Sequence, residues 1–202
     1  MKKVKKGTYG YIRYEKKKRL LVTFIMFAIP LVIYVTGYIQ TKTRLNLFTF
    51  VAILGCLPAA KSMVGLIMMG MQKSLKANEY ETLKAAAGNL TAGYEMIFTA
   101  YEHTTMADAV VVCGNHVVCY TRDKDCKPAD LEKHITRILT ANSFPDAEVK
   151  VMKDLKTYTT RAKDLCAKQD HLREGLEYTP DSRYPDFTRD EMIFHVLLAI
   201  CL

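Results

Sequence analysis

Four side chains in the middle of the sequence are of types that hold metal ions or move protons. Glu102, His103, Asp108 and His116 combine two carboxylates with two imidazoles within 15 residues. Such groups ligate divalent transition metals and act as general acids and bases. Their spacing matches no zinc-binding pattern, and solvated residues at strand ends are the favoured interpretation. They are the candidate catalytic residues, and no metal site is assigned to them.

A thiol and an imidazole flank the dipeptide Gly114-Asn115. Cys113 and His116 can act as a nucleophile with its base, but side chains at the end of a hairpin also meet by geometry alone, which is the preferred interpretation. His195, inside an apolar C-terminal run, is expected to be a core histidine. The sequence contains no glycine-rich phosphate loop, zinc-protease motif or Cys-x-x-Cys pair, so we expect no cofactor.

These residues must be positioned by a domain over residues 72–202, which we predict to be α+β with a mostly antiparallel four-stranded sheet flanked by helices. Gly114-Asn115 is typical of a hairpin turn that pairs Val112 with Val117, which places the hairpin inside the sheet. Thr188 and Glu191 have the spacing of a capping box before an apolar helix, for which core packing is expected. The expected helices cover 73–87, 128–142, 155–172 and 192–202, and the expected strands cover 94–102, 108–113, 116–122 and 147–152.

The order helix, three strands, helix, strand over residues 73–152 resembles the core of the restriction-endonuclease-like superfamily. In that family an Asp at the start of the second strand and an acid-x-Lys on the third strand bind a metal and activate water. Asp108 matches the first of these positions, whereas residues 116–122 (HVVCYTR) contain no acid-x-Lys. The resemblance therefore implies a catalytically silent relative used as a scaffold. The active alternative would use Asp108 with Glu95 or Glu102 and a metal.

Two apolar runs precede this domain. Residues 20–39 are 20 consecutive uncharged residues, long enough for a helix to cross the hydrocarbon layer of a bilayer. The second run, 45–71, is interrupted by Lys61, and a span over about 45–68 would let its ammonium group snorkel to the nearer surface. The sequence predicts a two-span transmembrane hairpin over residues 20–71.

Small residues recur at four-residue spacing on the second span. Such spacing lets two helices approach closely, and packing on the first span is favoured over self-association. The helix-packing candidates are Ala52, Gly55, Cys56, Ala59 and Ala60.

The chain has 202 residues, 50% of them hydrophobic, and a formal net charge of +8. All of that excess lies in residues 1–19, which hold nine basic residues and one acid, Glu15. A basic arm before an apolar run favours an anionic lipid surface as its partner and a cytoplasmic N-terminus. The arm consists of Lys2, Lys3, Lys5, Lys6, Arg13, Lys16, Lys17, Lys18 and Arg19.

A hairpin returns the chain to its starting side of the membrane, so residues 72–202 are also expected in the cytoplasm. The cysteine spacing indicates no disulfide framework, which agrees with a reducing compartment. Those residues hold 17 Lys/Arg and 20 Asp/Glu, and no nucleic acid is expected as a partner. We therefore predict a multi-pass cell-membrane protein. Its expected role is that of an accessory or scaffold protein that binds another protein or itself at the inner face. The alternatives are a nuclease-like enzyme and an oligomerising membrane effector.

Overall fold

The chain forms two compact units. The computed structural model describes all residues except 1–3, 44–45, 101–102, 177 and 181–182. One unit consists of Ile12–Ser74, and the other combines the preceding described residues, 4–11, with Leu75–Leu202.

The first unit is a pair of long apolar helices, α1 (Tyr11–Thr41) and α2 (Leu47–Met71). Polar contacts join them near both ends. At one end Arg19 donates from Nη1 to the Gly65 carbonyl at 3.0 Å, and at the other Asn46 donates from Nδ2 to Thr41 Oγ1 at 2.7 Å. Between these ends most large side chains are exposed, such as Phe24 at 73% and Leu57 at 68%.

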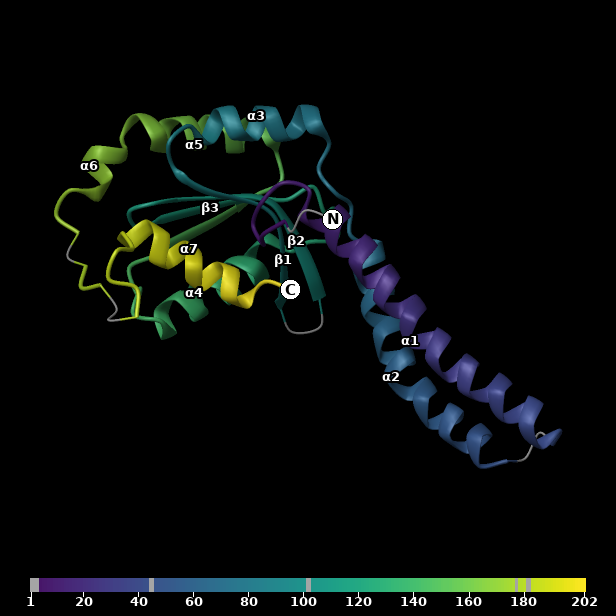
Figure 1. Cartoon of the computed structure of the whole chain (residues 1–202). Coiled ribbons are helices and arrows are strands. Elements are labelled where there is room, and N and C mark those ends of the chain that lie inside the picture. Colours follow the sequence, from purple (N-terminus) through teal and green to yellow (C-terminus); the bar gives the residue numbers. More distant parts are fainter. Residues whose placement is uncertain (1–3, 44–45, 101–102, 177, 181–182) are drawn as a thin grey trace. The chain divides into compact units, whose positions relative to one another are not determined.

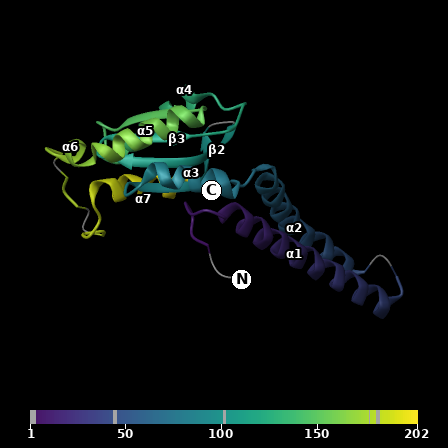
Figure 2. The ribbon, with the colours of Figure 1, turned by 90° about the horizontal axis from the view of Figure 1, so that it is seen from above.

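The second unit is a four-stranded mixed sheet with helices on both faces (Figures 1 and 2). The strands lie in the order β1-β2-β3-β4; only β3 and β4 are parallel. Helices α3 and α5 cover one face of the sheet with core residues such as Leu83 and Tyr158. Helices α4 and α7 cover the other face with core residues such as Ile135 and Ile193. The elements are α3 (Ala77–Ala87), β1 (Thr91–Ala100), β2 (His103–Cys113), β3 (His116–Tyr120), α4 (Pro128–Ala141), β4 (Glu148–Met152), α5 (Leu155–Ala167), α6 (Gln169–Arg173) and α7 (Arg189–Ile200).

The predicted hairpin register and helix cap are confirmed. Val112 pairs with Val117 across the Gly114-Asn115 turn, and both are fully buried. Thr188 and Glu191 form the capping box of α7, whose Ile193 lies in the core.

Backbone groups at both edges of the sheet have partners. On β1, Tyr94 donates its N–H to the Gly7 carbonyl at 2.9 Å, and the Ile97 carbonyl accepts from the Leu202 N–H at 3.0 Å. On β4, the Val151 N–H donates to Glu132 Oε1 at 2.8 Å. These contacts oppose edge-to-edge association.

Several boundaries differ from the sequence prediction. β2 begins at His103 rather than at 108, so Asp108 lies within the strand and not at its start. The helix expected over 73–87 begins only at Ala77, and residues 72–76 between α2 and α3 are not helical. The helix expected over 155–172 ends at the Lys168 cap and gives way to the short α6. The predicted arm is not a separate segment: residues from Tyr11 onward continue into α1, and those before it belong to the globular unit.

Candidate functional site

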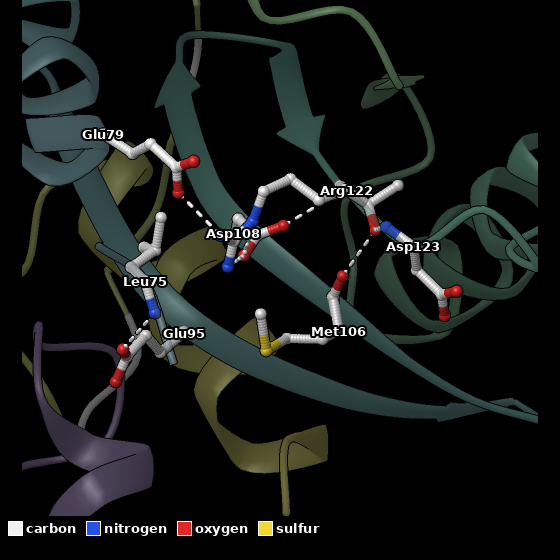
Figure 3. A network of polar contacts seen from close by, with 8 residues as sticks. Leu75, Glu79, Glu95, Met106, Asp108, Arg122 and Asp123 are labelled. Carbon is white, nitrogen blue, oxygen red and sulfur yellow. Dashed lines mark hydrogen bonds and ion pairs between the residues drawn. The ribbon is translucent and has the colours of Figure 1, made fainter. Parts of the chain in front are cut away.

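Asp108, one of the four catalytic candidates, lies in a polar network within the globular unit (Figure 3). Its Oδ1 accepts from Arg122 Nε at 3.0 Å and Nη2 at 2.7 Å, and its Oδ2 accepts from the Arg122 backbone N–H at 2.8 Å. Arg122 also donates from Nη1 to Glu79 Oε2 at 2.6 Å. One guanidinium group thus links carboxylates from β2 and α3.

The Asp108 side chain is enclosed by protein, with 0% of the residue exposed. Burial raises the pKa of Asp108, and the hydrogen bonds and charge of Arg122 offset this only in part. Both carboxylate oxygens are hydrogen-bonded to Arg122, so the observed arrangement is a structural ion pair.

A second buried acid, Glu95, lies opposite Asp108 in the ladder. The flanking pairs are Tyr94↔Ala109 and Met96↔Ala107, and Glu95 between them has a φ of 53°. Tyr94 and Ala109 pack on the α3–α5 face, whereas Met96 and Ala107 pack on the α4–α7 face. In both strands, therefore, the residues directly before and after this position face opposite sides of the sheet, whereas in a regular strand they would face the same side. Glu95 Oε1 accepts the backbone N–H of Leu75 at 2.9 Å (Figure 3).

The remaining catalytic candidates do not gather around Asp108 in the described part of the chain. His116 Nδ1 lies 3.2 Å from Glu148 Oε2 on β4. The Cys113 thiol is buried against the Leu165 carbonyl at 3.9 Å, and burial raises its pKa. Glu102 lies outside the described residues, and only the backbone of His103 is described. Among described residues, no three His, Cys, Asp or Glu side chains form a metal-binding group.

The small residues of α2 divide between two environments. Ala52 and Ala59 are buried, and a Cβ at Gly55 would lie 3.0 Å from Pro30 Cγ of α1. Cys56 and Ala60 are exposed, as is Lys61.

The position of Lys61 along the length of the hairpin follows from the contact that the next residue, Ser62, makes with α1. Ser62 Oγ lies 2.9 Å from Thr23 Oγ1, four residues beyond Arg19 on α1. At 1.5 Å per residue, Lys61 therefore lies roughly 6 Å from the level of Arg19, at the basic end of the hairpin.

Three side chains of the predicted basic arm bond to backbone carbonyls within their own unit. Lys16 Nζ donates to Gly70 at 3.0 Å and to Gln72 at 2.5 Å, Arg19 donates to Gly65, and Lys6 Nζ donates to Cys201 at 2.9 Å. Arg19 also pairs with Glu15 at 3.2 Å. Lys5, Arg13, Lys17 and Lys18 are exposed, and Lys2 and Lys3 lie outside the described residues.

The sequence did not predict a cavity of about 710 Å³ beside α7. Its wall combines rings from Phe144, Tyr178 and Tyr184 with basic side chains from α7 and the preceding loop. The lining residues are Asn142, Ser143, Phe144, Tyr178, Thr179, Arg183, Tyr184, Arg189, Met192, His195, Val196, Ala199 and Ile200.

His195, expected in the core, instead lines this cavity. It is half-buried, with its ring centroid 4.7 Å from that of Tyr184 and 5.8 Å from that of Phe187. The helix is apolar on more than one side, so its periodicity did not identify the side that faces the loop. Tyr178, Arg183 and Tyr184, which lie close together in the sequence before α7, were the available indication that this loop lines a cavity.

The chain matches no family model, no curated protein and no solved structure.

Proposed function

We propose that this protein is a two-pass membrane protein that holds a non-enzymatic α+β domain at the cytoplasmic face, where the domain binds another protein. The observation that carries the proposal is the apolar surface of the α1–α2 hairpin. Phe24, Leu57 and most of their large apolar neighbours are exposed within the unit. Fully covering one such side chain is worth about 1.5–3 kcal/mol, so a lipid environment strongly favours this hairpin over water.

The polar contacts of the hairpin support the same placement. Arg19 and Lys16 are held at one end by carbonyls of α2, and Asn46 and Thr41 bond to each other at the other end. Between these polar ends, residues 20–41 of α1 extend about 32 Å at 1.5 Å per residue, close to the roughly 30 Å of a hydrocarbon core.

Charge asymmetry supports a cytoplasmic domain. The end of α1 nearest the globular unit in sequence carries Arg13, Lys16, Lys17, Lys18 and Arg19, whereas Lys42 and Arg44 are the basic residues between the helices. The positive-inside bias favours the first group on the cytoplasmic side. The exposed members of this group are also suited to anionic lipid head groups, each contributing about 1 kcal/mol.

A non-enzymatic role is supported by the state of Asp108. A metal-dependent nuclease would need this carboxylate open to a metal ion, but Arg122 occupies both of its oxygens. The element order α3-β1-β2-β3-α4-β4 supports a restriction-endonuclease-like scaffold as a proposal. Self-association through the exposed Cys56 and Ala60 side of α2 is the remaining alternative, and chemical crosslinking in native membranes distinguishes it.

The decisive experiment is cysteine labelling, in intact cells and in opened membranes, of full-length variants in which Cys56 and Cys166, the two native cysteines that are not buried, are replaced by Ser. Lys42→Cys, between the two helices, should react with a membrane-impermeant maleimide in intact cells. Lys163→Cys, exposed on α5, should react only after the membrane is opened. Both variants should stay with the membrane after an alkaline carbonate wash. Extraction by carbonate, or labelling of Lys163→Cys in intact cells, would contradict the proposal.

A further inference from the structure

We propose that the cavity beside α7 binds a small organic anion, with one carboxylate or phosphate group on an apolar or aromatic body. This inference concerns the globular unit alone and does not depend on where the hairpin resides.

The charged side chains of the lining select for an anion. Arg183, Arg189 and His195 line the cavity, and its described lining residues include no Asp or Glu. The two acids of α7 have partners outside the lining. Asp190 Oδ2 lies 2.7 Å from Arg173 Nη2 and its Oδ1 accepts the Gly114 N–H at 2.8 Å, and Glu191 Oε2 accepts the Thr188 N–H at 2.8 Å.

Arg189 is held in place before any ligand arrives. Its Nη2 donates to Asn115 Oδ1 at 2.6 Å, and its Cζ lies 5.3 Å from the centroid of the Phe144 ring. Because two contacts already fix the guanidinium plane, binding would cost little side-chain entropy.

Two donors in the wall have no acceptor among the described residues: Arg189 Nε and Tyr178 Oη. A buried donor without an acceptor is unfavourable, and an acceptor carried by a ligand would satisfy it. Both atoms are covered by protein. Binding is therefore expected to turn the Tyr178 hydroxyl toward the ligand, while the Arg189 guanidinium keeps its contacts with Asn115 and Phe144.

The rest of the wall suits an apolar body. Phe144, Tyr184, Met192, Val196 and Ile200 contribute aromatic and aliphatic surface. A volume of about 710 Å³ falls within the range of small-molecule sites, roughly 300–1,000 Å³. An inorganic anion alone would leave this surface uncovered and is expected to bind more weakly.

The test is calorimetric titration of the full-length protein in non-ionic detergent with benzoate, phenyl phosphate, inorganic phosphate and benzyl alcohol. Benzoate or phenyl phosphate should bind, and whichever is tighter identifies the anionic group. Inorganic phosphate and the neutral alcohol should bind at least about tenfold more weakly, as expected for loss of the apolar body or of a charge-assisted hydrogen bond.

Arg183→Gln should weaken binding of the preferred anion about tenfold. Arg161→Gln on α5, which packs on the opposite sheet face, is the matched control and should leave the affinity unchanged. Ala199→Tyr, at an exposed lining position, fills the cavity and should abolish binding while the circular dichroism spectrum is retained. Absence of binding by both organic anions, equal binding of benzyl alcohol, or equal weakening by Arg161→Gln would overturn the inference.

Discussion

At the residue scale, the buried Asp108 carboxylate is tolerated because one arginine satisfies both of its oxygens. Arg122 donates to them from its backbone and from its side chain. Removing one partner of a buried pair leaves the other desolvated without compensation, which costs more than the pair contributes. Glu79, the third member of the network, is partly exposed and has a smaller effect because water screens its charge.

Asp108→Ala is therefore expected to lower the free energy of unfolding by about 3–5 kcal/mol. Glu79→Gln, the matched change on the same guanidinium, should lower it by less than about 1 kcal/mol. Urea titration of the full-length protein in detergent, followed by circular dichroism, measures both. Equal effects of the two substitutions would show that burial does not govern the network.

The pairing of Asp108 with Arg122 could be inferred from the sequence, whereas the cavity beside α7 could not. The predicted pairing of Val112 with Val117 continues in the structure to Ala109↔Tyr120, and this register places Asp108 beside the end of β3 and hence near Arg122. The cavity combines residues 142–144, the loop before α7 and one side of α7. No sequence periodicity links those segments, because they meet only through tertiary packing.

At the element scale, the α1–α2 hairpin depends on close approach at a few positions. A Cβ at Gly55 would meet Pro30 Cγ at 3.0 Å, and one at Gly37 would meet Phe48 Cβ at 2.3 Å. The spacing of small residues predicted that α2 has a packing side, but only the structure separates Gly55 from the exposed Ala60. The reversal at Glu95 was also hidden, since strict alternation assumes an unbroken ladder.

Gly55→Leu should separate the two helices by steric overlap and destabilise the hairpin by about 1–3 kcal/mol. Ala60→Leu adds side-chain bulk on the exposed side of the same helix and should have little effect. Protease resistance and thermal melting in detergent compare the two variants. A hairpin more sensitive to Ala60→Leu would instead indicate that the exposed side is an interface.

At the scale of the whole molecule, the basic residues divide into two roles. Lys6, Lys16 and Arg19 bond to carbonyls within their own units, whereas Arg13, Lys17 and Lys18 are exposed. In the proposed membrane placement, the exposed group is the more accessible to lipid head groups, although Lys18 also lies 3.5 Å from Glu15. Topology should therefore depend on it without loss of the fold.

Simultaneous replacement of Arg13, Lys17 and Lys18 by Gln should produce a mixed orientation in the Lys42→Cys and Lys163→Cys labelling assay. Replacement of Lys124, Lys133 and Lys156, three exposed lysines of the globular unit, removes the same charge and should leave orientation unchanged. A uniform orientation in the first variant would show that the basic residues do not determine topology.

The globular unit is assembled from two stretches of chain with the apolar hairpin between them. Gly7 bonds to β1, and Lys6 bonds to the carbonyl of Cys201, 195 residues later. During synthesis the first stretch emerges long before its partners, so the fold closes only when the C-terminal residues leave the ribosome. A version without the hairpin would accordingly retain residues 4–11 and replace 12–74 by a linker, because a chain starting at 75 loses the Gly7 contact with β1 and the Lys6 contact with Cys201.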